Sequence, residues 1–374
     1  MSRLQKLHDE GQSIWLDNID RPMLQNGDLE RRIAEDSLTG MTSNPTIFEK
    51  ALAEGTEYDE QLASATGLSP HEAFELVETT DVRSACDLFA GVYSSTRGDD
   101  GYVSIEVSPG VSADVAATVA EAHRLWETVD RPNVMVKVPG TQQGALAVRQ
   151  LIADGINVNI TLLFSLDAHD RVIDAYMSGL EDRVAAGNPI DHVFSVASFF
   201  VSRVDTEVDK RLDEMIKAAN PPDRDRLKML KGRTAIANAK LAYRLFRRRF
   251  DDQRWKSLAE QGARLQKPLW ASTGVKNPAY RDVMYVEELI GPDTVNTMPP
   301  ALIEAFKDHG DMQRTVDKRL GAAEGLIREI EAVGISMKDV TDKLLVDGLA
   351  SFQKSFDSLN AGIERKMSQL PAAK

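Results

Sequence analysis

Short stretches of alternating apolar and polar residues are separated by longer stretches with helical periodicity along most of the chain. The short stretches are rich in β-branched residues, which is typical of strands. They lie at residues 13–19, 40–45, 102–107, 134–139, 158–163, 192–199, 267–273 and 293–298. Strands that alternate with helices predict a parallel sheet, and eight such units within residues 13–310 predict a (β/α)₈ barrel.

The alternation within the strands predicts which side chains point into the barrel. In residues 102–107 the apolar side chains share one face, and Ser104 and Glu106 share the other. In residues 134–139 three valines oppose Met135 and Lys137. The same parity groups further polar side chains late in other strands, namely Asp17, Asn159 and Thr161. Because catalysis in this fold takes place at the C-terminal mouth, these polar residues are candidates for an active site.

Three segments of the chain contain more predicted helices than a minimal (β/α)₈ barrel requires. Residues 46–101 contain at least two predicted helices, and residues 204–266 contain about three. Helical periodicity continues from about 313 to 370, with apolar residues at i, i+3 and i+4. Such spacing indicates helices that pack against the barrel, so we expect residues 1–374 to form a single domain.

The composition narrows the possible partners and ligands. A net charge of -13 argues against a general nucleic-acid or anionic-membrane surface. No apolar run approaches the ~20 residues of a membrane span. The six histidines lack metal-binding spacing, so we expect no metal. The single cysteine, Cys86, fits a reducing compartment such as the cytoplasm, and its helical setting favours a buried apolar role.

Lys137 is the most informative residue of the chain, because it lies within the apolar run Val-Met-Val-Lys-Val-Pro. An apolar setting disfavours a charged ammonium group, and a neutral amine can attack a carbonyl carbon to form a Schiff base. Alternatively, Lys137 extends from the edge of its strand into solvent. Its neighbours favour the chemical interpretation.

Two carboxylates accompany Lys137 on the polar faces of the strands. Glu106 is late in the preceding strand, so it should lie beside Lys137 and could deliver a proton during imine formation. Asp17, late in the first strand, is a second base that could deprotonate a hydroxyl during carbon–carbon cleavage. The structural alternatives are a simple ion pair for Glu106 and a helix cap for Asp17.

The polar side chains of Asn44, Asn159 and Thr161 could hold the hydroxyl groups of a substrate bound at Lys137. Asn44 precedes Pro45, so it could instead do no more than begin a turn before the next helix.

Four strings in this chain resemble the transaldolase family. They are GMTSNPTIF (40–48), VMVKVPGT (134–141), NVNITLLFS (157–165) and SFFVSR (198–203), in family order and spacing. The resemblance covers roughly residues 10–310. It implies a barrel enzyme of the pentose phosphate pathway, acting on sugar phosphates without a cofactor.

The resemblance also implies roles for individual residues. Lys137 would be the Schiff-base lysine, Glu106 the acid/base at the carbinolamine stage, and Asp17 the base for cleavage. Thr161 would hold a catalytic water. Donor hydroxyls would be bound by Asn44, Asn159 and Ser198.

The phosphate site departs from the family pattern. Arg203 and Ser272 match family positions for phosphate binding, but Gly274 stands where the family has a second arginine. We expect Lys276, two residues further on, to supply the missing charge. The alternative is that Lys276 is solvated and that Arg203 acts with backbone donors.

Phe200 bears on the reaction outcome. Related aldolases, which release dihydroxyacetone, carry tyrosine at this position, and a phenyl ring offers no hydroxyl to hold a proton or water. We therefore expect transfer rather than release, unless Phe200 is only a core residue. A fructose-6-phosphate-type aldolase and a non-catalytic sugar-phosphate-binding barrel remain the alternatives. The sequence leaves the choice between monomer and homodimer open.

Overall fold

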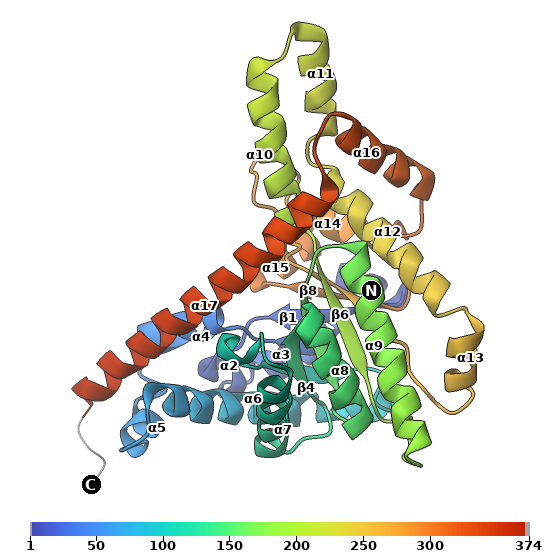
Figure 1. Ribbon diagram of the computed structural model, residues 1–374. Helices are drawn as coiled ribbons and strands as arrows, with labels where there is room; N and C mark the ends of the chain where they lie inside the picture. The colour runs from blue at the N-terminus through green and yellow to red at the C-terminus, as the bar shows by residue number, and fades with distance from the viewer. Residues whose placement is uncertain (1, 371–374) are drawn as a thin grey trace.

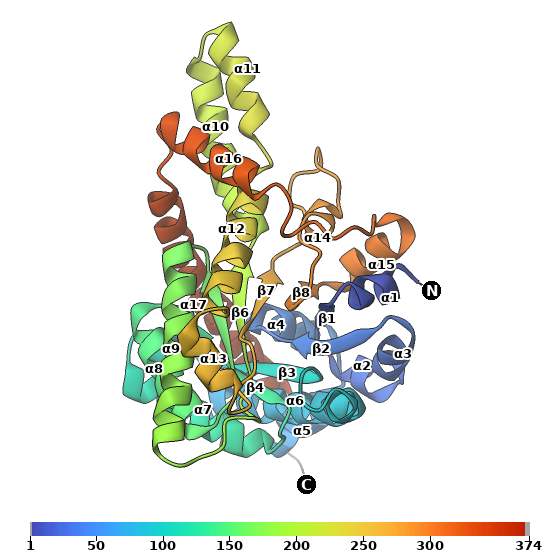
Figure 2. The ribbon, with the colours of Figure 1, turned by 90° about the vertical axis from the view of Figure 1, so that its right-hand side faces the viewer.

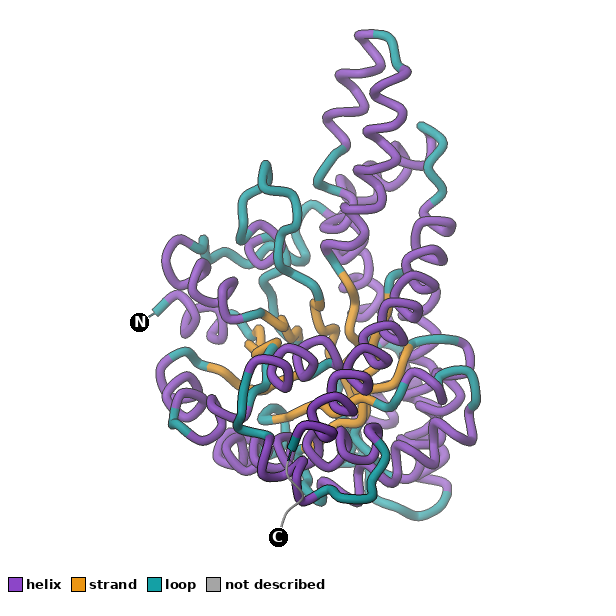
Figure 3. Tube along the Cα trace, turned by 90° about the vertical axis from the view of Figure 1, so that its left-hand side faces the viewer, coloured by secondary structure: helices purple, strands orange, loops and turns teal. Residues whose placement is uncertain are grey.

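Eight parallel strands close into a barrel in chain order, β1-β2-β3-β4-β5-β6-β7-β8. The computed structural model describes residues 2–370, except for the side chains of residues 50, 53 and 54. Figure 3 shows the strands enclosed by helices, so the predicted (β/α)₈ barrel is confirmed. The strands are β1 (Gln12–Asp17), β2 (Leu38–Thr42), β3 (Tyr102–Glu106), β4 (Val134–Pro139), β5 (Val158–Leu163), β6 (Ser195–Phe200), β7 (Lys267–Ala271) and β8 (Thr294–Met298).

The predicted parity of the strands is also confirmed. The alternating valines of β4 belong to the main hydrophobic core between barrel and helices, whereas Met135 belongs to a separate cluster inside the barrel. The large side chains of that cluster, which include Trp15, Tyr102, Phe194 and Leu269, fill the interior of the barrel. This packed floor lies beneath the polar side chains at the C-terminal ends of the strands.

The strand boundaries correct several sequence predictions: β1 ends at Asp17 rather than at residue 19, β7 ends at Ala271 rather than at residue 273, and larger differences lie in β2 and β6. β2 ends at Thr42 rather than reaching residue 45, because Asn44 already caps the following helix. β6 begins at Ser195 rather than at residue 192, where His192 is exposed. The errors in β2 and β6 arose because the residues next to each strand continue its alternation of apolar and polar side chains, so the pattern does not show where the strand begins or ends.

Helices surround the barrel and extend it (Figure 1). They are α1 (Arg3–Asp9), α2 (Arg21–Gln25), α3 (Asp28–Glu35), α4 (Pro45–Glu54), α5 (Asp59–Ser64), α6 (Pro70–Ser95), the 3₁₀ helix η1 (Pro109–Val111), α7 (Val115–Val129), α8 (Gln142–Asp154), α9 (Leu166–Ala185), α10 (Ser202–Ala218), α11 (Pro221–Leu230), α12 (Thr234–Arg249), α13 (Gln253–Ala259), α14 (Met284–Glu287), α15 (Pro300–His309), α16 (Leu320–Ala332) and α17 (Met337–Gln369). None of the helices among residues 2–370 is both long and apolar enough to cross a bilayer.

The additions to the barrel lie in three places, the first of which is the segment between β2 and β3 that forms α4, α5 and α6. Between β6 and β7 the chain forms four helices, α10 to α13, where about three were expected. Of these, α10 and α11 form a hairpin that projects from the body of the molecule beside α16 (Figure 2). The last helix, α17, runs diagonally across the molecule and packs along α4 and α6 (Figure 1). The C-terminal helices therefore pack on the barrel, as their periodicity predicts.

Candidate active site

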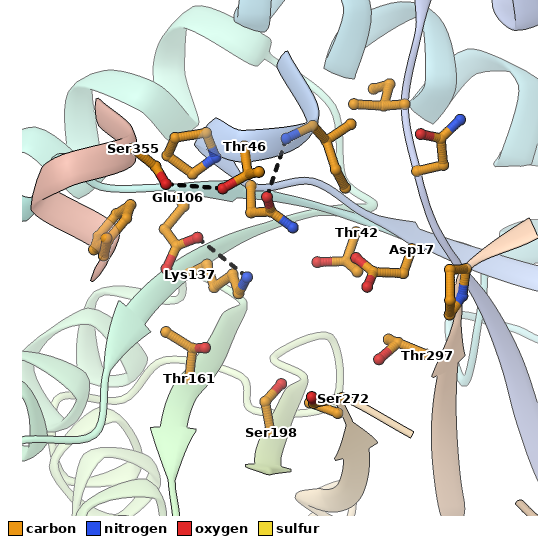
Figure 4. A pocket seen from close by; sticks show the side chains of 18 of the residues that line it. Asp17, Thr42, Thr46, Glu106, Lys137, Thr161, Ser198, Ser272, Thr297 and Ser355 are labelled. Atoms are coloured by element: carbon orange, nitrogen blue, oxygen red, sulfur yellow. Dashed lines mark hydrogen bonds and ion pairs between the residues drawn. The ribbon is translucent and has the colours of Figure 1, made fainter. Parts of the chain in front are cut away.

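A cavity of about 830 Å³ opens at the C-terminal end of the barrel. The last residues of several strands line it, as the parity argument requires. These strand residues are Asp17, Thr42, Glu106, Lys137, Thr161 and Ser198. Figure 4 shows their side chains converging on one space from different sides of the barrel.

Lys137 and Glu106 form a buried ion pair in this cavity. Their Cα positions are partners in the β3–β4 register, and the lysine Nζ lies 3.1 Å from the glutamate Oε2. Nζ also donates to the Ser43 carbonyl at 3.4 Å. Burial raises the pKa of Glu106, and the neighbouring lysine charge opposes this rise. The strand-edge alternative for Lys137 is wrong, because its side chain is only 10% exposed.

Asp17 faces the same cavity from the end of β1. Burial raises the pKa of its carboxyl group, and the positive charges of Lys137 and Lys276 act in the opposite direction. Its neighbour Thr42 was not among the predicted site residues; the Thr42 Oγ1 is buried and has no hydrogen-bond partner among the described residues. Thr42 lies beside Asp17 in Figure 4. Thr42 could have been predicted as a site residue, because it has the same parity as Asn44 in the predicted strand at residues 40–45.

Asn159 lies below the cavity rather than on its wall. Its amide nitrogen donates to Ser104 Oγ at 3.0 Å, and its oxygen accepts from Ser198 Oγ at 2.7 Å. Ser198 itself lines the cavity, whereas Asn159 is not among the lining residues. Asn159 is thus positioned to orient the Ser198 hydroxyl from beneath.

Asn44 caps a helix and also reaches the cavity. It is the N-cap of α4, and its Oδ1 accepts from the backbone N–H of Ile47 at 3.2 Å. It also lines the cavity. Because capping occupies the side-chain oxygen, the amide nitrogen is the group left for a ligand.

The end of β5 departs from regular strand geometry where Thr161 enters the cavity. Between the β5–β6 partners Ile160–Ala197 and Leu163–Phe199, β5 advances three residues and β6 only two. This one-residue bulge contains Leu162, whose φ of 58° is in the left-handed region. Such bulges redirect side chains, and here both Thr161 and Leu162 line the cavity.

The far side of the cavity carries positive charge. Arg203, the second residue of α10, lines it, and its guanidinium carbon lies 5.1 Å from the ring centroid of Phe200. Burial lowers the pKa of Arg203. Phe200 also lines the cavity and contacts the ring of Phe164 at a centroid separation of 5.2 Å. Phe200 is therefore a cavity residue rather than one behind the strand.

The loop after β7 completes this side of the cavity. Ser272, Gly274 and Lys276 all line the cavity. Ser272 has a φ of 57°, and its hydroxyl lies 2.9 Å from that of Ser202 in a hydrogen bond. The structure thus brings Lys276 to the same cavity as Arg203, although Gly274 provides no charge.

The C-terminal helix forms a wall of the cavity that the sequence did not reveal. α17 contributes Gly348, Ser351, Phe352 and Ser355, and Ser355 accepts a hydrogen bond from Thr46 Oγ1 at 2.9 Å (Figure 4). A Cβ atom at Gly348 would lie 3.0 Å from Leu162 Cδ2, so α17 packs closely on the β5 bulge. Helical periodicity predicts that one face of α17 is buried but does not identify the surface that buries it.

A barrel with a buried lysine–carboxylate pair at its C-terminal mouth is typical of a (β/α)₈ enzyme. A family model described as Transaldolase/Fructose-6-phosphate aldolase matches residues 14–363. The chain is 47% identical to the transaldolase of Thermobifida fusca (strain YX) over 99% of both chains. It is 42% identical to that of Trichodesmium erythraeum (strain IMS101), over 99% of this chain and 98% of the relative. The chain belongs to this family and is an enzyme of the transaldolase type, a transferase.

The contact between α17 and β5 can be tested by replacing Gly348 with Val. The added methyl groups would overlap Leu162 and force α17 away from the bulge that carries Thr161. We expect transaldolase activity to fall about tenfold, because displacements near 1 Å around a catalytic group have large effects on rate. Steady-state kinetics and thermal unfolding would measure the effect.

Gly362→Val provides a matched control on the same helix, because the nearest atom to a Cβ there is an Arg365 nitrogen at 3.9 Å. Both changes alter helix propensity alike, so Gly362→Val should keep wild-type activity. Equal activity in the two variants would show that close packing of α17 on β5 is unimportant for the reaction.

Proposed function

We propose that this enzyme transfers a dihydroxyacetone unit from sedoheptulose 7-phosphate or fructose 6-phosphate to an aldose phosphate. The acceptor would be glyceraldehyde 3-phosphate or erythrose 4-phosphate, in the non-oxidative pentose phosphate pathway. The observation that carries the proposal is the buried Lys137–Glu106 pair, with Asp17 in the same cavity. These residues suffice for Schiff-base chemistry, so the reaction requires no cofactor.

Imine formation begins with the free amine of Lys137. In a buried pair, the raised pKa of Glu106 favours transfer of the lysine proton to the carboxylate, which leaves both groups neutral. The Nζ lone pair then attacks the C2 carbonyl of the ketose to form a carbinolamine. Glu106 returns a proton to the carbinolamine hydroxyl, directly or through a water held by Thr161, and water leaves as the imine forms.

Asp17 acts in the next step. Asp17 removes the proton from the C4 hydroxyl, and the C3–C4 bond then breaks. The electron pair of that bond moves toward the iminium nitrogen, so that the three-carbon unit remains on Lys137 as an enamine. The aldose phosphate leaves with a newly formed carbonyl group. Burial favours this step, because a carboxylate whose pKa is raised is a stronger base. Attack of the enamine on the acceptor aldehyde reverses the sequence of bond changes.

Polar side chains around Lys137 would hold the three-carbon unit while it waits for an acceptor. Ser198 is oriented by Asn159, and the Asn44 amide nitrogen faces the same cavity. The phosphate would lie at the cationic side, where Arg203, Ser272 and Lys276 line the cavity. This arrangement supports a substrate with its ketone at Lys137 and its phosphate toward α10.

A cytoplasmic location is part of the proposal. Cys86 is a free, buried thiol, and burial raises its pKa, which disfavours the reactive thiolate. A buried unpaired thiol is compatible with a reducing compartment.

The Schiff base can be tested with borohydride. Incubation with fructose 6-phosphate and borohydride should add a three-carbon or six-carbon sugar mass to the peptide containing Lys137 in the wild type. Lys137→Met removes the amine and avoids burying a charge, so we expect a folded protein with no adduct and activity at least about a thousandfold lower. Mass spectrometry and circular dichroism would measure both. Normal turnover in Lys137→Met would rule out the proposed chemistry.

If Asp17 is the base for cleavage, its loss should block a later step of the reaction than the loss of Lys137. Asp17→Asn keeps the volume of the side chain but removes the base, so the imine should form while cleavage slows about 10²–10⁴-fold. The trapped adduct should then carry the whole donor sugar. Glu106→Gln is the matched comparison, since it should lower the rate of trapping itself. If Asp17→Asn instead accumulated the three-carbon adduct, Asp17 would not be the cleavage base.

A substitution at Phe200 tests why the three-carbon unit is transferred to an acceptor rather than released as free dihydroxyacetone. Its ring lines the cavity without a hydroxyl, which limits proton and water delivery to the enamine. We expect Phe200→Tyr to gain release of free dihydroxyacetone from fructose 6-phosphate and to lose transfer to erythrose 4-phosphate. Coupled assays on one preparation give the ratio of the two rates. Phe199→Tyr, on the opposite face of β6, is the control; an unchanged ratio in Phe200→Tyr would refute the role of Phe200.

A further inference from the structure

The loop between β7 and α14 is attached to α10 at both ends. At its start, the backbone N–H of Ser202 donates to the Ser272 carbonyl at 3.0 Å, and the two serine hydroxyls are hydrogen-bonded. At its end, the phenol of Tyr280 donates to Asp209 Oδ2 at 2.5 Å. Arg203 lies on α10 between these two attachment points.

The Tyr280–Asp209 contact is held in place by Gly232, in the turn between α11 and α12. Asp209 is only 7% exposed, and its other oxygen accepts from the backbone N–H of Gly232 at 3.0 Å. Gly232 has a φ of +67°, and a Cβ atom there would lie 2.6 Å from Tyr280 Cζ. The tyrosine ring therefore lies directly on Gly232, where the backbone conformation and the close approach both require glycine.

The attachment at Tyr280 is only a short turn away from Lys276. The backbone N–H of Tyr280 donates to the Asn277 carbonyl at 3.0 Å, and Asn277 Oδ1 accepts from the Ala279 N–H at 3.0 Å. Lys276 immediately precedes this turn, and its side chain lines the cavity although the residue is largely exposed. The course of the loop, rather than side-chain packing, therefore decides where the ammonium group lies.

We propose that Tyr280 is a positioning residue for the anion-binding side of the cavity. Its bond to Asp209 fixes the loop carrying Lys276 against the helix carrying Arg203, so that both cations reach one phosphate group. This inference rests on the proposed function, in which the phosphate lies there. A lysine on an unattached loop would lose more conformational freedom on binding and would bind the anion more weakly.

Tyr280→Phe tests the proposal by removing only the hydroxyl. We expect the KM for fructose 6-phosphate and the inhibition constant of inorganic phosphate to rise together, by about 3–10-fold, because part of a charge-assisted contact is lost. The value of kcat should stay within about twofold. The rate of borohydride trapping with dihydroxyacetone, which has no phosphate, should not change.

Two further variants separate positioning from general loosening. Tyr243→Phe removes another phenolic bond, to the Pro292 carbonyl at 3.1 Å, between residues outside the cavity lining. It should keep wild-type constants. Asp209→Ala removes the partner of Tyr280, so it should raise both constants at least as much as Tyr280→Phe. The double variant should then be no worse than Asp209→Ala alone.

The outcomes distinguish this proposal from the proposed function. Absence of a Lys137 adduct in the wild type would refute the Schiff-base function itself. With an active wild type, unchanged constants in Tyr280→Phe would refute the positioning role. An equal slowing of dihydroxyacetone trapping would also refute it, because the defect would then extend to the reaction centre. Additive effects of Tyr280→Phe and Asp209→Ala would do the same.

Discussion

The buried pair of Lys137 and Glu106 is the constraint on which the rest of the site depends. Removing two charges from water costs several kcal/mol per ion, which only close and well-fixed geometry can offset. The closed barrel provides this geometry, because the β3–β4 register sets the two residues opposite each other. Its packed apolar floor excludes water from below. A pair held in this way can exist as two charges or as two neutral groups, and the proposed chemistry requires the second form.

The mouth of the barrel takes its shape from local departures from regular structure. The β5 bulge directs both Thr161 and Leu162 to the cavity, and Ser272 adopts a left-handed conformation at the end of β7. Each such conformation costs about 1–3 kcal/mol, so surrounding contacts must stabilise it. At β5 those contacts include α17, which packs Gly348 against Leu162. The wall contributed by the C-terminal helix and the strained strand end therefore depend on each other.

Much of this site could be predicted because strand geometry is periodic. Side chains alternate between two faces, and parallel strands bring their C-terminal ends together, so residues late in different strands must meet. Lys137, Glu106 and Asp17 could be identified in this way, and Asn159, which has the same parity, makes hydrogen bonds to Ser104 and Ser198. It could not identify the α17 wall, since periodicity shows that a face is buried without showing its partner. The Tyr280–Asp209 contact was equally inaccessible, because it joins a helix to a loop, and no periodic pattern predicts the course of a loop.

The distribution of charge gives the cavity a direction. The chain carries a net charge of -13, and the reaction centre itself contains two carboxyl groups, so an anionic substrate is repelled by most of the protein. Arg203 and Lys276 bring positive charge to the lining of the cavity. Phe200 also lines the cavity, with its ring against the Arg203 guanidinium. On the proposed function, a single aromatic ring therefore supports phosphate binding and excludes water from the enamine, so substitutions at Phe200 should alter both properties together.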